Sequence, residues 1–128
     1  IQQLDAAQRV LYDRAVALFF ANHNIELPTA LAYAESELAA RQDIYAYDTL
    51  AWVLYRLGRF DEARAASDRA LQLGTPDAQL HYHAGLIAAA QGDAARATTY
   101  LRRALELNPH FDLLQAEAAR TALAALEK

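Results

Sequence analysis

Histidine, the side chain used most often for metal binding and proton transfer, occurs four times in this sequence. The four positions are His23, His81, His83 and His110. Side chains four residues apart share one face of a helix, whereas His81 and His83 are two apart and point in different directions. We therefore predict no metal site, and we interpret His81 as a half-buried packing residue.

Other residue groupings that carry chemistry are also missing. The sequence has no cysteine, which excludes thiolate chemistry, disulfides and zinc–thiolate sites. No Ser-His-Asp set, glycine-rich phosphate loop or pair of pocketed carboxylates can be recognised. Two acidic pairs are expected at helix starts or on solvated faces: Asp61 with Glu62, and Glu35 with Glu37. We therefore predict that the chain is not an enzyme and uses no cofactor.

Composition places these side chains in one helical domain. The 128 residues are 55% hydrophobic and 22% charged, with 4 Gly and 3 Pro, which is enough apolar material for a continuous core. Alanine and other helix-forming residues dominate, so an all-α fold is expected. The net charge of −4 argues against nucleic acid as a partner. No run reaches the roughly 18 apolar residues of a membrane span, so no membrane insertion is expected.

The first residue is Ile1 and the sequence contains no methionine. We therefore interpret the chain as a fragment or a processed product. Targeting information and further domains of a parent protein would then lie outside it, and the sequence leaves its compartment open.

An internal repeat organises the central part of the chain. Gly58 and Gly92 are 34 residues apart (92 − 58), as are Ala63 and Ala97 (97 − 63). Each glycine follows an apolar run, where a residue with positive φ ends a helix at low cost. The spacing predicts two helix–turn–helix units with helices at 44–57, 61–73, 76–90 and 94–107.

Weaker helical patterns flank the repeat. A first helix is expected at 5–23, with Asp5 as its N-cap, and a second at 29–41 after a break that includes a proline. A final helix is expected at 111–127. Within the repeat, Thr75 is expected to cap the helix that follows it.

The repeat resembles the tetratricopeptide repeat family, whose unit is a pair of antiparallel helices with small residues where the helices touch. The matching residues are Leu50, Ala51, Phe60, Ala63 and Ala70 in one unit, and Gly85, Ala97, Ala104 and Pro109 in the next. The resemblance implies an α-α superhelix, a right-handed solenoid of helical hairpins, in a single domain over 1–128, and a bacterial protein. Its parts would be a degenerate hairpin at 1–43, repeat units at 44–77 and 78–111, and a capping helix at 112–128.

Two stripes of side chains run along the helix expected at 44–57. The stripe expected in the core consists of Tyr47, Leu50, Ala51, Leu54 and Leu57. In the related family, the second stripe and its equivalents line a concave groove that receives peptides or partner helices. The resemblance therefore implies a partner-binding groove made of Tyr45, Asp48, Trp52, Tyr55, Arg56, Gln79, Tyr82, Leu86 and Arg120.

The aromatic members of this set have two readings. Trp52 and Tyr82 are anchors if they lie free on the groove, because aromatic side chains bury a large area at small entropic cost. Alternatively, they pack between neighbouring hairpins. Tyr47 and Tyr12 are expected in the core.

The best-known groove in this family grips the C-terminal carboxylate of a peptide with Lys, Arg and Asn. The corresponding positions here carry Asp48, Trp52 and Leu86. Because Asp48 would repel a carboxylate, we reject this carboxylate clamp as the function.

We predict a protein-interaction scaffold that binds a protein or peptide segment in the groove. Two alternatives remain open. One is a structural domain that forms homo-oligomers by stacking on copies of itself, and the other is a regulatory domain of a larger enzyme.

Overall fold

A computed structural model describes residues 6–127 of the chain, which form seven α-helices and no strand. The expectation that Asp5 caps the first helix falls outside the described residues. The helices are α1 (Ala6–His23), α2 (Leu27–Ala40), α3 (Ile44–Arg56), α4 (Phe60–Leu71), α5 (Ala78–Ala90), α6 (Ala94–Leu107) and α7 (Leu113–Leu126). The predicted all-α fold is confirmed, with helix ends within about two residues of the expected ones.

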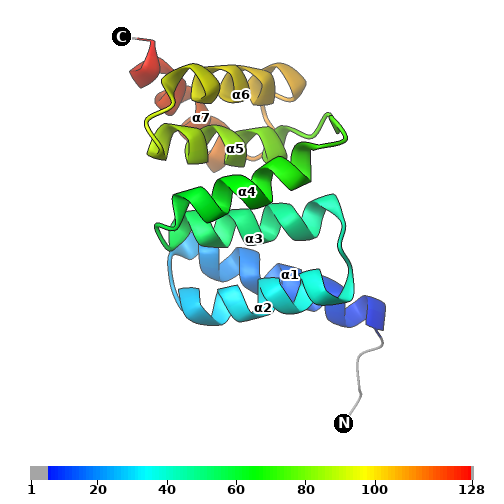
Figure 1. The fold of residues 1–128 in the computed structure, drawn as a ribbon. Coiled ribbons are helices and arrows are strands. Elements are labelled where there is room, and N and C mark those ends of the chain that lie inside the picture. The colour runs from blue at the N-terminus through cyan, green and yellow to red at the C-terminus, as the bar shows by residue number, and fades with distance from the viewer. Residues whose placement is uncertain (1–5, 128) are drawn as a thin grey trace.

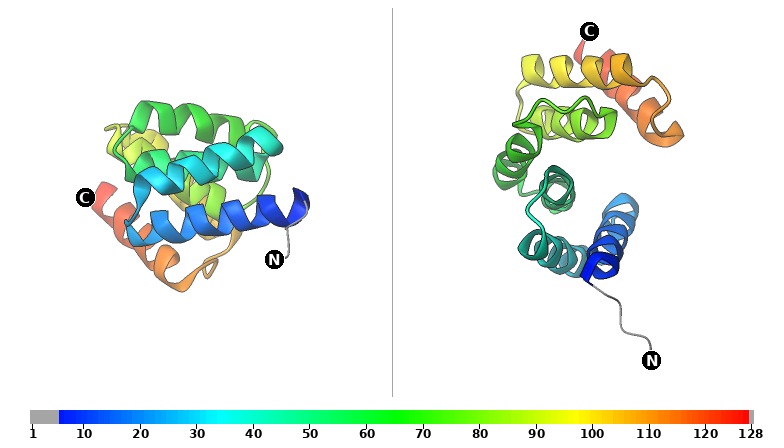
Figure 2. Two further views of the ribbon diagram at one scale, coloured as in Figure 1. Left: turned by 90° about the horizontal axis from the view of Figure 1, so that it is seen from below. Right: turned by 90° about the vertical axis from the view of Figure 1, so that its right-hand side faces the viewer.

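Successive helices pack antiparallel as hairpins and stack into an arc (Figure 1). Contacts also join α1 to α3, α3 to α5 and α5 to α7, whereas among the described residues the even-numbered helices do not touch one another. The odd-numbered helices are therefore the inner row of the arc. Figure 2 shows the arc in its right-hand view, with α1 and α7 at the two ends.

Both hairpin turns of the repeat use a glycine with positive φ, as the sequence predicts. Gly58 has φ of 82° and Gly92 has φ of 81°. The same two hydrogen bonds close each turn: the glycine amide bonds to the carbonyl three residues back, and the next amide bonds to the carbonyl five residues back. This pattern satisfies carbonyls that the end of a helix leaves free.

The expected cap of α5 is wrong. Asp77, not Thr75, is the N-cap, and its carboxylate accepts hydrogen bonds from the amides of Gln79 and Leu80. Asp43 caps α3 in the same way, 34 residues earlier (77 − 43), by accepting from the amide of Ala46. The sequence reasoning used the proline as the helix start and overlooked this repeated aspartate.

Small residues allow the helices of each hairpin to approach closely. Ala51, Ala63 and Ala97 have no exposed surface. At Gly85 in α5, a Cβ atom would lie 2.7 Å from the side chain of Leu101 in α6, so only glycine fits at this crossing.

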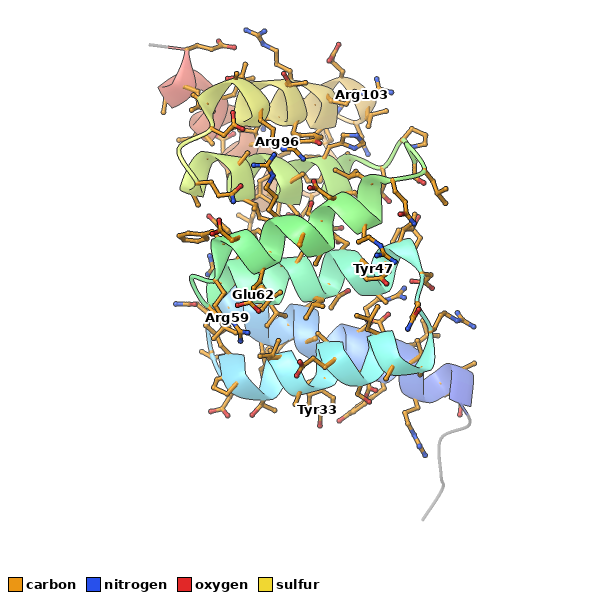
Figure 3. The ribbon with its side chains drawn as sticks, in the orientation of Figure 1. Tyr33, Tyr47, Arg59, Glu62, Arg96 and Arg103 are labelled. Carbon is orange, nitrogen blue, oxygen red and sulfur yellow. The ribbon has the colours of Figure 1, made fainter. Side chains whose placement is uncertain are left out.

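The stripe of α3 expected in the core is only partly buried. Ala51 and Leu54 are buried, whereas Tyr47, Leu50 and Leu57 are half-buried. Tyr47 lies against α4, where the Arg69 guanidinium sits 5.1 Å from the centre of its ring (Figure 3). The stripe faces the outer helix, which covers it incompletely.

Two expectations for the first hairpin are also wrong. Tyr12 is not in the core: it is 50% exposed and packs edge-on against Tyr33 of α2. Glu37 is not on a solvated face: it is fully buried in α2 and ion-paired with Arg14 of α1. Burial of this carboxylate became possible because the arginine from the neighbouring helix supplies a counter-charge.

Candidate functional site

The residues expected to form the groove lie on the inner row, but the structure gives them unequal access to solvent. Tyr45 and Arg120 are exposed. Four more are half-buried: Tyr55, Arg56, Gln79 and Leu86. The remaining three are buried: Asp48, Trp52 and Tyr82.

Trp52 joins three helices of the inner row. Its ring stacks on His83 of α5, with ring centres 4.1 Å apart, and on Tyr55 of its own helix at 5.0 Å. Its indole nitrogen donates a hydrogen bond to Asn22 Oδ1 of α1 at 2.9 Å. With only 3% of its surface exposed, Trp52 does not offer a free aromatic face. The packing alternative therefore describes its place in the apo structure.

Tyr82 is buried in a similar way. It is 4% exposed and lies between Trp52 and Phe111, whose ring centres are 5.9 and 5.5 Å from its own. Burial raises the pKa of its phenol to about 12. The expectation of free aromatic side chains on the groove wall fails for both residues, because neighbouring helices of the inner row cover them.

A buried Asp48–His83 pair connects α3 to α5, and sequence reasoning missed it. His83 has no exposed surface, and its Nδ1 donates to Asp48 Oδ1 at 2.8 Å, since an ionised carboxylate can only accept. The two residues are 35 positions apart, one more than the repeat length. They therefore occupy neighbouring positions of successive repeats, which is the one signal that could have indicated the contact.

Arg56 fixes the end of the first helix. Its Nε donates to the carbonyl of Ala21 at 2.9 Å, and its guanidinium carbon lies 5.9 Å from the Trp52 ring centre. Cations stabilise the carboxyl-terminal end of a helix, where carbonyls point outward. In this structure Arg56 therefore holds α1 in place.

A cavity of about 170 Å³ lies among α1, α3 and α5. It brings together three of the expected groove residues: Tyr45, Asp48 and Gln79. The other residues around it are Arg14, Leu18, Thr49, Asp77 and Leu80. Arg14 and Leu18 come from the first hairpin, which sequence reasoning did not include in the groove. Their four-residue spacing on a helix was the available signal.

Arg120 is outside this cavity. On α7 it donates to the carbonyl of Pro109 at 3.1 Å and pairs with Glu117 at 3.0 Å. The structure therefore places it with the loop that precedes α7 rather than with the other expected groove residues.

Within residues 6–127, no three metal-binding side chains come close enough to hold an ion together. In the same part of the chain, no helix has both the length and the apolar character needed to cross a membrane.

The two hairpins that repeat at 34 residues define an α-solenoid, the class of proteins built by stacking similar helical units. The sequence model of the tetratricopeptide repeat family matches residues 49–110. The chain is a tetratricopeptide repeat protein. No curated protein sequence matches it.

Solved structures share this fold over nearly the whole chain. A mutant of the Thermobaculum terrenum O-GlcNAc transferase has a TM-score of 0.82 and 21% identity over 98% of this chain and 23% of that one. The second TPR domain of human RPAP3, in complex with the HSP70 peptide SGPTIEEVD, has a TM-score of 0.74 and 15% identity over 97% of this chain and 99% of that one.

A third similar structure is the type III secretion translocator chaperone SycD of Yersinia enterocolitica. It has a TM-score of 0.76 and 16% identity over 98% of this chain and 87% of that one. At these identities the likeness shows the fold alone. The chain spans only 23% of the length of the transferase.

Proposed function

We propose that this protein is a non-catalytic interaction scaffold that binds an extended segment or a helix of a partner protein along its inner row of helices. The observation that carries the proposal is the cavity among α1, α3 and α5, which unites Tyr45, Asp48 and Gln79 from two successive repeats. A binding site needs an indentation with a few fixed polar groups and an accessible apolar side chain.

Tyr45 is the anchor in this proposal. It is 41% exposed, and the guanidinium of Arg14 lies 5.6 Å from its ring centre, which holds the ring beside the cavity. A tyrosine in this position gives a partner apolar area to bury together with a polar end. Trp52 and Tyr82 have a supporting role, because their stacking fixes the floor formed by α3 and α5.

Two of the similar structures support this function. The human RPAP3 domain was solved with a bound peptide, and SycD is a chaperone of a secretion translocator. Both share the fold over almost all of this chain. The transferase structure supports the regulatory-domain alternative only weakly, because the chain covers less than a quarter of it.

Selection from a phage-displayed library of random peptides tests the proposal, with affinities of the enriched peptides measured by calorimetry. We expect Tyr45→Ala to weaken their binding by about tenfold or more, as loss of an anchor typically costs ~2 kcal/mol. The matched control is Tyr47→Ala, which removes the same side chain from the opposite face of α3, against Arg69. That variant should bind the peptides normally.

Melting of each variant shows whether the fold survives. The proposal is wrong if no peptide is enriched, or if the enriched peptides depend on Tyr47 and not on Tyr45.

A further inference from the structure

The cavity among α1, α3 and α5 carries more negative than positive charge. Among its lining residues, Asp48 and Asp77 are acidic and Arg14 is basic. Arg14 is already compensated, because its guanidinium contacts Glu37 and lies 3.5 Å from Asp43 Oδ1. Two fixed carboxylates beside a compensated arginine give the cavity a negative potential.

Each of the two aspartates uses only one oxygen in the fold. Asp48 Oδ1 accepts from His83 Nδ1 at 2.8 Å. Asp77 Oδ1 accepts from the first-turn amides of α5 at 2.9 and 3.3 Å. Across residues 6–127, no donor engages Oδ2 of either side chain.

The Asp48 carboxylate is held in a nearly dry position. Its side chain is 9% exposed, and its orientation is fixed by a histidine that has no exposed surface. Hydrogen bonds to a charged group in such surroundings are stronger than on an open surface. A free acceptor there therefore favours a donor that is itself charged.

We propose, on the basis of the proposed function, that this cavity receives a basic side chain of the partner segment, lysine or arginine. Asp48 is the principal counter-ion and Asp77 the second acceptor. Leu18, Leu80 and the ring of Tyr45 contact the aliphatic stem, as long basic side chains bury their stems against apolar surface. The volume of about 170 Å³ is several times that of a water molecule, which suits the end of a long side chain.

Chemical-shift titration tests this with small probes and requires no identified partner. The probes are N-acetyl-arginine amide and N-acetyl-lysine amide, each against its neutral counterpart, the citrulline or the acetyl-lysine derivative. The backbone amides of Thr49, Gln79 and Leu80 report on the cavity. We expect saturable shifts of these amides with the charged probes and none with the neutral ones.

Asp48→Asn removes the charge and leaves the fold in place, because the amide oxygen can still accept from His83. We expect it to weaken binding of the charged probes by at least about fivefold. The control is Asp68→Asn, which makes the same change on α4, where Asp68 pairs with Arg96. That variant should bind the probes as the unchanged protein does.

Three results would overturn the inference: equal shifts with the neutral probes, unchanged binding by Asp48→Asn, or the same shifts from calcium chloride at lower concentration. The last would assign the site to a metal ion. Peptide selection separates this inference from the proposed function. Enriched peptides that depend on Tyr45 but carry no basic residue would contradict the inference alone, whereas probe binding without any enriched peptide would contradict only the scaffold function.

Discussion

Glu37 is the most unusual charged residue of the fold. It lies fully buried in α2, and one of its carboxylate oxygens, Oε1, has no hydrogen-bond partner within residues 6–127. Burial raises its pKa above the ordinary value of 4.5, although the nearby Arg14 lowers the pKa in part. The folded protein thus binds this proton more tightly than the unfolded chain does.

The sign of the resulting pH dependence follows from this shift. Because the pKa of Glu37 is higher in the folded state, the free energy of unfolding falls as the pH rises from about 4.5 through the folded pKa. We expect Glu37→Gln to lose this fall, which amounts to about 1.4 kcal/mol for each unit of the shift. Urea unfolding across this pH range measures it.

Glu35→Gln is the matched control, because Glu35 lies on the same helix with its side chain exposed. Its pH profile should follow that of the unchanged protein. If Glu37→Gln also keeps that profile, burial does not dominate the titration of this carboxyl group.

At the scale of the helical elements, the hairpin turns decide where each helix ends. Gly58 has φ of 82°, and no atom lies within 4 Å of the place where a Cβ would be. Any cost of a substitution is therefore conformational rather than steric. We expect Gly58→Val to lower the free energy of unfolding by about 1–2 kcal/mol, because a β-branched residue tolerates positive φ poorly.

Gly58→Asn separates conformation from the mere loss of glycine, since asparagine enters the left-handed region more readily. Its loss of stability in thermal or urea unfolding should be smaller than that of Gly58→Val. An unchanged melting temperature for the valine variant would count against this assignment of the turn.

At the scale of the whole molecule, the two ends of the arc are secured differently. Of the described helices, α7 touches only α5 and α6, and it buries only Ala116 and Ala119. Leu113 and Leu114 at its start are 80% and 84% exposed. Helix α3, by contrast, packs against α1, α2, α4 and α5.

We therefore expect α7 to open without global unfolding. Its amide protons should exchange with solvent at least about tenfold faster than those of α3 and α5, since local opening follows the number of buried contacts. Hydrogen exchange followed by NMR measures this for each residue. Equal protection of α3 and α7 would mean that the array unfolds as one cooperative unit.

The sequence by itself determined the elements and their repetition. The spacing of Gly58 and Gly92 predicted the hairpins, because a residue with positive φ is required at the same point of each unit. Periodicity of apolar residues predicted the helices in the same way. These features are local, so each depends on residues within one or two turns.

Which side chains remain free was decided only by the tertiary structure. Periodicity placed Asp48 and Trp52 on one stripe of α3, but it could not show that an inner helix is covered on that side by α1 and α5. Trp52 is buried because Asn22 and His83 meet it from those two helices.

The same reason applies to the charges. Glu37 is buried because Arg14, 23 positions earlier, faces it across the first hairpin. The cavity that unites Tyr45 with Asp77 exists only where three helices meet. Pairings over such separations depend on how the helices stack, which the pattern within any one helix does not encode.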